Sequence, residues 1–101
     1  MKLATITPLL VSLVLIPEAA QADEALAQSK GCLGCHAVDK KVLGPAYKDV
    51  AAKYAGQNVV DQLAQKVIKG GGGVWGQIPM PPNSVTPEEA KKLVQWVLSK
   101  K

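Results

Sequence analysis

Both cysteines and the only histidine of this 101-residue chain lie in one run of five residues, Cys32-Leu33-Gly34-Cys35-His36. A Cys-x-x-Cys-His run is the attachment motif of a c-type haem. Each thiol can add across one vinyl group of the same porphyrin, and the histidine that follows is then held beneath the ring with a nitrogen directed at the iron. The motif predicts a haem bonded to Cys32 and Cys35, with His36 as an iron ligand.

The motif alone leaves three other interpretations open. A redox dithiol of the thioredoxin type would need a strand–helix–strand context, and no strand pattern surrounds these cysteines. A closed zinc site would need a carboxylate or water as well, because the chain offers only two cysteines and one histidine. A structural disulfide between Cys32 and Cys35 is the third interpretation.

Residues 1–22 have the pattern of a secretory signal peptide. Lys2 gives a positive start, residues 9–16 form an apolar core, and Ala20-Gln21-Ala22 is a small-x-small cleavage site. The apolar run is shorter than the roughly 20 residues that span a bilayer, and an uncleaved membrane anchor is the alternative. We therefore expect a mature domain of residues 23–101 in the periplasm, where a free cysteine pair would be oxidised.

Met80 is the only methionine outside the predicted signal peptide. Methionine in general is more often core filling than a ligand. Here, however, Met80 lies in Ile78-Pro79-Met80-Pro81-Pro82-Asn83, where each proline restricts φ to about −65° and stiffens the loop. A strong sixth ligand makes a haem an electron carrier, and an open position allows oxygen chemistry or gas binding. We predict that Met80 is the second iron ligand.

Four helical segments and no convincing strand are predicted around these residues. The best-defined start is Thr86-Pro87-Glu88-Glu89, a capping box with proline at the first helical position. The helix that follows should place Trp96 in the core and Lys100-Lys101 at its negative end. The other three helices are residues 23 or 24 to 30, a segment between Gly44-Pro45 and Gly56, and a segment that begins at residue 57 or 58 and ends at residues 70–73. Residues 74–85 should form an irregular loop.

Four short helices without a phenylalanine would build only a thin core. The mature domain is also near the limit of about 70–80 residues, below which a chain usually needs a disulfide, a metal or a similar staple. A flat apolar cofactor between the helices would complete the core. We expect an all-α fold in which four short helices are wrapped around one covalently attached haem.

Residues 23–101 contain 11 lysines, no arginine and 7 acidic residues, for a net charge of +4. This balance favours transient docking to acidic protein surfaces. Nucleic acid is a poor alternative because the chain has no arginine and no basic helix interleaved with aromatic residues. The lysines expected near the docking face are Lys30, Lys40, Lys41, Lys66 and Lys69.

Over nearly all of residues 23–101, the sequence resembles the small bacterial class I cytochromes c of the c-551/c-552 type. The segments that carry the resemblance are Cys32–His36, Gly44-Pro45-Ala46, Gly73-Val74-Trp75-Gly76, Ile78–Asn83 and Trp96-Val97-Leu98. The resemblance implies an electron carrier and not an enzyme, and we expect a monomer. Its expected partners are a quinol-oxidising complex as donor and a terminal reductase, peroxidase or oxidase as acceptor.

The resemblance also implies roles for three residues around the iron. The Pro45 carbonyl would accept the Nδ1–H of His36, the Trp75 indole N–H would reach a haem propionate, and the Asn83 amide would contact the Met80 sulfur. A haem enzyme or gas sensor, in which Met80 leaves the iron, is the alternative function. It would need polar catalytic groups above the iron, and the chain has no second histidine and no arginine.

Overall fold

The computed structural model describes residues 5, 8 and 18–101, so most of the predicted signal peptide lies outside the described residues. The described part is helical, and its only β-type pairing is an isolated bridge between Gly71 and Met80. This confirms the predicted all-α fold. The elements are α1 (Glu18–Ser29), a 3-10 turn η1 (Cys32–Gly34), α2 (Tyr47–Lys53), α3 (Val60–Lys69) and α4 (Pro87–Leu98).

The helix before the haem motif begins earlier than predicted. α1 starts at Glu18 and not at residue 23 or 24, so it crosses the predicted cleavage site. It ends close to the predicted position, because Gly31 adopts a left-handed conformation with φ of 77° that few other residues tolerate. Cys32 then begins η1, a turn of three residues that is too short to give a periodic pattern in the sequence.

The third helix begins two or three residues later than predicted and ends as predicted. Val59, not a polar residue, occupies the cap position of α3, and it makes no side-chain capping bond. Its side chain is buried, with 8% exposed, so tertiary packing determines this start. At the other end, Gly70 has φ of 74° and stops the helix after Lys69.

The start of α4 confirms the predicted capping box. Thr86 Oγ1 accepts a hydrogen bond from Glu89 N at 3.1 Å, and Glu89 Oε1 accepts one from Thr86 N at 2.9 Å. The other end differs from the prediction, because α4 stops at Leu98 and has no basic residue in its last turn. Lys100 lies beyond the helix, with its Nζ 4.3 Å from the centre of the Trp96 ring.

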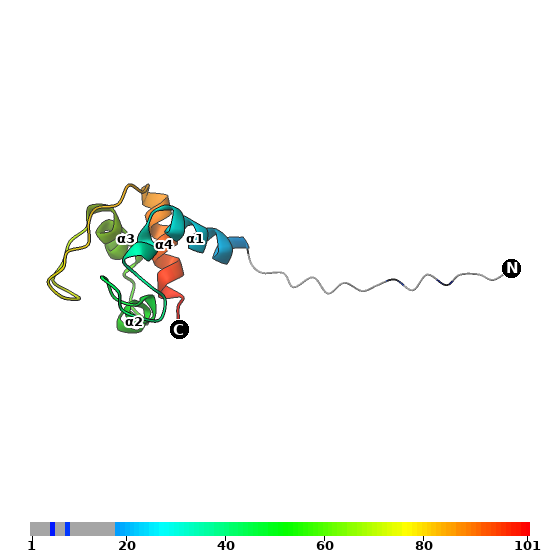
Figure 1. Cartoon of the computed structure of the whole chain (residues 1–101), viewed down its shortest axis with the longest axis horizontal. Helices are drawn as coiled ribbons and strands as arrows, with labels where there is room; N and C mark the ends of the chain where they lie inside the picture. Colours follow the sequence, from blue (N-terminus) through cyan, green and yellow to red (C-terminus); the bar gives the residue numbers. More distant parts are fainter. Residues whose placement is uncertain (1–4, 6–7, 9–17) are drawn as a thin grey trace.

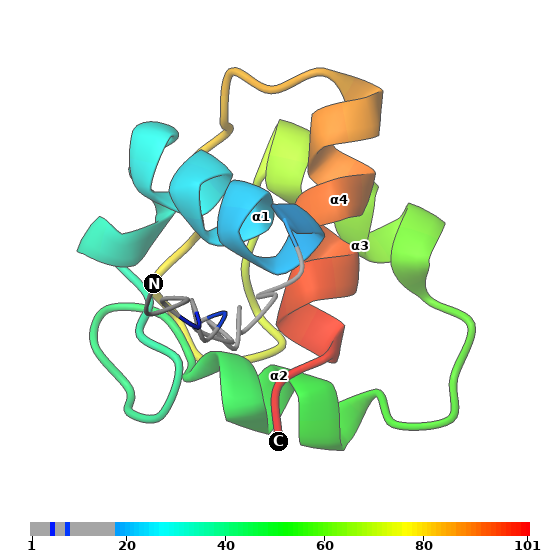
Figure 2. The same cartoon turned by 90° about the vertical axis from the view of Figure 1, so that its right-hand side faces the viewer.

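α4 is the central element and packs against α1, α2 and α3 (Figures 1 and 2). The contacts bury two small clusters, one of Ala27, Tyr47, Leu93 and Trp96 and the other of Ala64, Ala90 and Val94. Trp96 is 5% exposed, which confirms its predicted place in the core. Three of these seven residues are alanines, so the core is as thin as the composition predicts.

The capping box should make the stability of the protein depend on pH. The Thr86 N–H, with a weaker contribution from Lys30 at 3.7 Å, holds the pKa of Glu89 below its usual range. The stabilisation is therefore complete above the unfolded-state value of about 4.3 and is lost as pH falls through the lower folded-state value. We expect Glu89→Gln to reduce this pH dependence in urea unfolding curves, and Glu88→Gln to leave it as in the wild type.

The hydroxyl half of the box can be tested separately. Thr86→Ala removes the side-chain acceptor for Glu89 N and should lower the free energy of unfolding by about 1 kcal/mol. Ser84→Ala, at an exposed position two residues earlier, serves as the control. Equal losses of stability in the two variants would contradict a capping role for Thr86.

Candidate functional site

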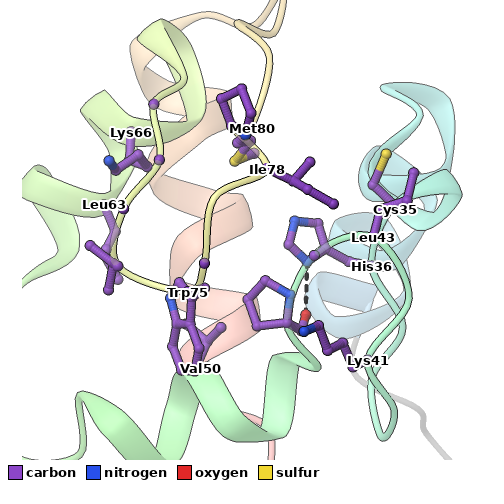
Figure 3. Close-up of a pocket in the computed structure, with 18 of the residues that line it drawn as sticks. Cys35, His36, Lys41, Leu43, Val50, Leu63, Lys66, Trp75, Ile78 and Met80 are labelled. Carbon is purple, nitrogen blue, oxygen red and sulfur yellow. Dashed lines mark hydrogen bonds between the residues drawn. The ribbon is translucent and has the colours of Figure 1, made fainter.

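A cavity of about 690 Å³ opens between the helices and two loops (Figure 3). The helices contribute apolar side chains to its wall: Val50 of α2, Leu63 of α3, and Val94 and Val97 of α4. The loops are residues 35–45, between η1 and α2, and residues 71–81, after α3. Its volume falls within the range of about 300–1,000 Å³ that is usual for ligand sites, so the cavity is large enough for a sizeable cofactor.

Large apolar side chains are exposed on the wall of this cavity. Among the described residues, every large hydrophobic side chain with high exposure lines it, and Ile78 is 68% exposed. The five residues are Val42, Leu43, Val74, Trp75 and Ile78. Exposed apolar residues gathered in one place mark a binding surface. An apolar group between the helices would cover them, which agrees with the cofactor that the thin core predicts.

One hydrogen bond fixes the tautomer of His36. His36 Nδ1 lies 2.8 Å from the Pro45 carbonyl oxygen (dashed in Figure 3). A carbonyl can only accept, so Nδ1 carries the proton and Nε2 keeps its lone pair for a metal. The structure thus contains the hydrogen bond that the resemblance implies. Such a bond orients a metal-binding imidazole and makes it a better donor.

Gly44 leaves room for the His36 imidazole. A Cβ atom at Gly44 would lie 2.8 Å from Nδ1 and 3.0 Å from Nε2 of His36, closer than atoms of this kind normally approach. The Gly44 backbone N also donates to the Cys35 carbonyl at 2.8 Å, which holds the loop against the motif. The sequence gives no local signal for this contact, because Gly44 could equally be an ordinary residue of a turn.

The two cysteines lie beside the cavity and are not joined to each other by a disulfide. Cys35 lines the large cavity, and both cysteines line a second cavity of about 70 Å³ together with His36 and Met80. Burial raises the pKa of the Cys32 thiol. The reactive thiols of disulfide oxidoreductases have a lowered pKa, so this environment disfavours the dithiol interpretation. No group of three potential metal ligands from His, Cys, Asp and Glu occurs among the described residues, as a zinc site would need.

Two backbone hydrogen bonds hold Met80 in the loop after α3. Met80 N donates to the Gly71 carbonyl at 2.8 Å, and Gly71 N donates to the Met80 carbonyl at 2.9 Å. Gly70 and Gly71 have φ of 74° and 135°, a region that glycine adopts without strain. The sequence indicates only that these glycines end α3 and does not predict the pairing of Gly71 with Met80. The loop thereby brings Met80 to the same two cavities as His36.

Asn83 closes the same loop onto α3. Its side-chain Nδ2 donates to the carbonyls of Val67 at 3.0 Å and Pro81 at 3.3 Å, and its backbone N donates to Val67 at 3.2 Å. The contact with the Met80 sulfur that the resemblance implies is not one of these hydrogen bonds, and it stays a prediction. In this structure Asn83 stabilises the return of the loop toward α4.

Trp75 lies at the cavity with 40% of its surface exposed. The Nζ of Lys53 is 5.6 Å from the centre of its ring and 5.8 Å from that of Tyr54, distances at which a cation is attracted to an aromatic face. Lys53 thereby joins the end of α2 to the loop after α3. The bond from the indole N–H to a propionate stays a prediction.

Comparison with known proteins identifies a family. The profile of the family described as cytochrome c matches residues 21–101. Cytochrome c-552 of Hydrogenobacter thermophilus is 55% identical over 92 residues, covering 90% of this chain and 94% of its own length. Cytochrome c-551 of Pseudomonas aeruginosa is 51% identical over 104 aligned positions, covering both chains completely. The crystal structure of wild-type Nitrosomonas europaea cytochrome c552 has a TM-score of 0.74 at 50% identity, covering 77% of this chain and 99% of its own.

The space beside Gly44 can be tested by a single methyl group. We expect Gly44→Ala to lower the free energy of unfolding by about 1–3 kcal/mol, because the new Cβ would overlap the His36 ring. Gly34→Ala is the control, since a Cβ there meets nothing within 4 Å. Urea unfolding measures both, and a Gly44→Ala variant as stable as the control would show that the ring is not confined here.

Proposed function

The chain belongs to the cytochrome c family, and we propose on that premise that it is a periplasmic electron-transfer protein with His36 and Met80 as its iron ligands. Members of this family carry one covalently attached haem c. The cysteines of the attachment motif, Cys32 and Cys35, would form its thioethers. The proposal rests on one observation above all: an imidazole with its free nitrogen fixed as Nε2 and a methionine from a distant loop border the same cavity.

The chemistry of the two donors fits this role. When bound, the haem supplies an iron that changes between the ferric and ferrous states. Pro45 holds the imidazole of His36, and the pairing with Gly71 holds the backbone of Met80. Because both donors are supported by main-chain hydrogen bonds, they would stay in place in either oxidation state. With the soft thioether of Met80 and the imidazole of His36 as its ligands, the iron would have a raised reduction potential.

We propose no enzymatic activity for the chain. Peroxide or oxygen chemistry requires an open iron position and polar groups that act on the bound oxygen. Ile78, Pro79 and Pro81, the chain neighbours of Met80, all line the cavity, and none of them carries a side-chain group that could donate or accept a proton. His36, the only histidine, donates its Nδ1 proton to Pro45. These residues favour a carrier over a catalyst.

The proposed location and partners rest on the sequence and on the charge near the cavity. The signal-peptide pattern of residues 1–22 supports export to the periplasm, and no described helix is long and apolar enough to cross a membrane. Lys41 and Lys66 line the cavity, where they could steer an acidic partner. A quinol-oxidising complex would be the donor to a monomeric carrier, and a terminal reductase, peroxidase or oxidase its acceptor.

The ligand assignment is tested by the visible absorption spectrum of the exported protein. We expect haem that remains attached after denaturing extraction, and a weak far-red band of iron–methionine ligation in the ferric protein. Met80→Ala should abolish this band, lower the reduction potential and let the ferrous protein bind carbon monoxide. Ile78→Ala, on the same loop, should keep the band. A wild-type protein without covalent haem, or one that binds carbon monoxide readily, would contradict the proposal.

Electrostatic steering predicts a salt-dependent rate. Electron transfer with the physiological partner should slow as ionic strength rises, because exposed charges are screened beyond about 8 Å at 0.15 M salt. Lys41→Gln and Lys66→Gln should each weaken this dependence in stopped-flow measurements. Lys92→Gln, at an exposed position of α4 that does not line the cavity, is the control with the same charge change. A rate independent of salt would rule out steering by these lysines.

A further inference from the structure

Tyr47 lies against the ring of His36, and we propose that it is a positioning residue that sets the rotation of this imidazole. The inference rests on the proposed role of His36 as an iron ligand. The centres of the two rings are 4.9 Å apart, and the ring planes differ by 21°. Tyr47 is 6% exposed, so water does not separate the rings or compete for this contact.

The hydrogen bond to Pro45 cannot orient the imidazole alone. It holds one ring atom, Nδ1, at 2.8 Å from the carbonyl oxygen. Small coupled rotations about the Cα–Cβ and Cβ–Cγ bonds can keep Nδ1 within hydrogen-bond distance of this oxygen while they move Nε2 and tilt the ring plane. A flat aromatic surface nearly parallel to the imidazole opposes this motion, because a large tilt would bring atoms of the two rings into overlap. The backbone of Gly44 limits the same motion on another side of the ring. It lies so close that a Cβ atom added to Gly44 would be only 3.0 Å from Nε2.

Tyr47 is itself fixed in place relative to His36. Its backbone N donates to the carbonyl of Ala37 at 2.9 Å, and Lys48 N donates to the carbonyl of Val38, also at 2.9 Å. The first residues of α2 are therefore bonded to the two residues that follow His36 in the chain. The side chain of Tyr47 is held by Trp96, whose ring packs edge-to-face against it. The ring centres are 5.5 Å apart and the ring planes differ by 76°. Backbone and core packing together determine the angle at which the tyrosine meets the imidazole.

Ring orientation has a measurable consequence for an iron ligand. An imidazole donates through its π system as well as through its lone pair, so the direction of its plane selects the iron orbital with which it overlaps. This choice sets the magnetic anisotropy of a ferric haem, which spreads the proton resonances of the haem methyl groups. Orientation of ligands by surrounding residues is a general means of tuning a metal site. Tyr47 would exert this control without touching the metal.

The experiment compares haem-methyl resonances in the ferric cyanide adducts of the wild type and four variants. Cyanide replaces Met80 and is cylindrically symmetric, so the pattern of methyl shifts reports the imidazole plane. Tyr47→Phe keeps the aromatic ring and should reproduce the wild-type pattern. Tyr47→Met and Tyr47→Leu remove the flat surface and should change the spread and order of the four methyl shifts. Leu93→Val weakens the core cluster that contains Tyr47 but leaves the tyrosine ring in place, and it should leave the pattern unchanged.

Two results would overturn the inference. The first is a wild-type shift pattern in Tyr47→Met or Tyr47→Leu with only a loss of thermal stability, which would reduce Tyr47 to core packing. The second is the absence, in the wild type, of nuclear Overhauser effects between protons of the His36 and Tyr47 rings. We expect these effects because the rings are in contact, and their absence would exclude that contact. Failure of the proposed function would be distinguishable from both results. In that case the wild type would lack covalent haem, or its ferric spectrum would lack the features of a histidine-bound iron, and this would be seen before any variant is compared.

Discussion

A hydrogen bond of 2.8 Å, from His36 Nδ1 to the Pro45 carbonyl, fixes the imidazole within the loop between the attachment motif and α2, which main-chain hydrogen bonds also hold closed. It decides which nitrogen of the only histidine is free to bind a metal, and it brings the start of α2 beneath that imidazole. Tyr47 and the Gly44 backbone can lie against the ring only because this loop is closed. The tautomer and the donor strength of His36 thus depend on one main-chain oxygen.

The opposite wall is also built from main chain and not from a well-packed core. Met80 is paired with Gly71, and Asn83 bonds to the last turns of α3. The helices contribute only small buried clusters rich in alanine, and large apolar side chains such as Ile78 face the cavity. The haem of a cytochrome c would bury these side chains, so in this family the cofactor is also the missing part of the hydrophobic core. Binding of the haem would then add directly to the free energy of unfolding of the protein.

The sequence predicted well the features that depend on local chemistry. The capping box at Thr86 and the stop at Gly70 follow from side chains within a few residues, and both were found. What it missed depends on contacts between distant segments. Val59 occupies the cap position of α3 because it is buried, and Lys100 lies over Trp96 instead of at the helix end. Neither the pairing of Gly71 with Met80 nor the space at Gly44 has a local signature, because each is defined by a partner elsewhere in the chain.

The three-residue turn η1 begins at Cys32 and is followed directly by Cys35, so the cysteine pair is local, whereas Met80 reaches the site only through the folded loop after α3. A short segment can adopt its bonding geometry with little loss of chain entropy, and a distant residue requires the closure of a long loop. We therefore expect assembly in two stages, in which Cys32, Cys35 and His36 can be joined to the porphyrin in a largely unfolded chain and Met80 arrives last. Mechanical or thermal stress would then reverse the order, releasing the thioether sulfur of Met80 while the local anchor holds.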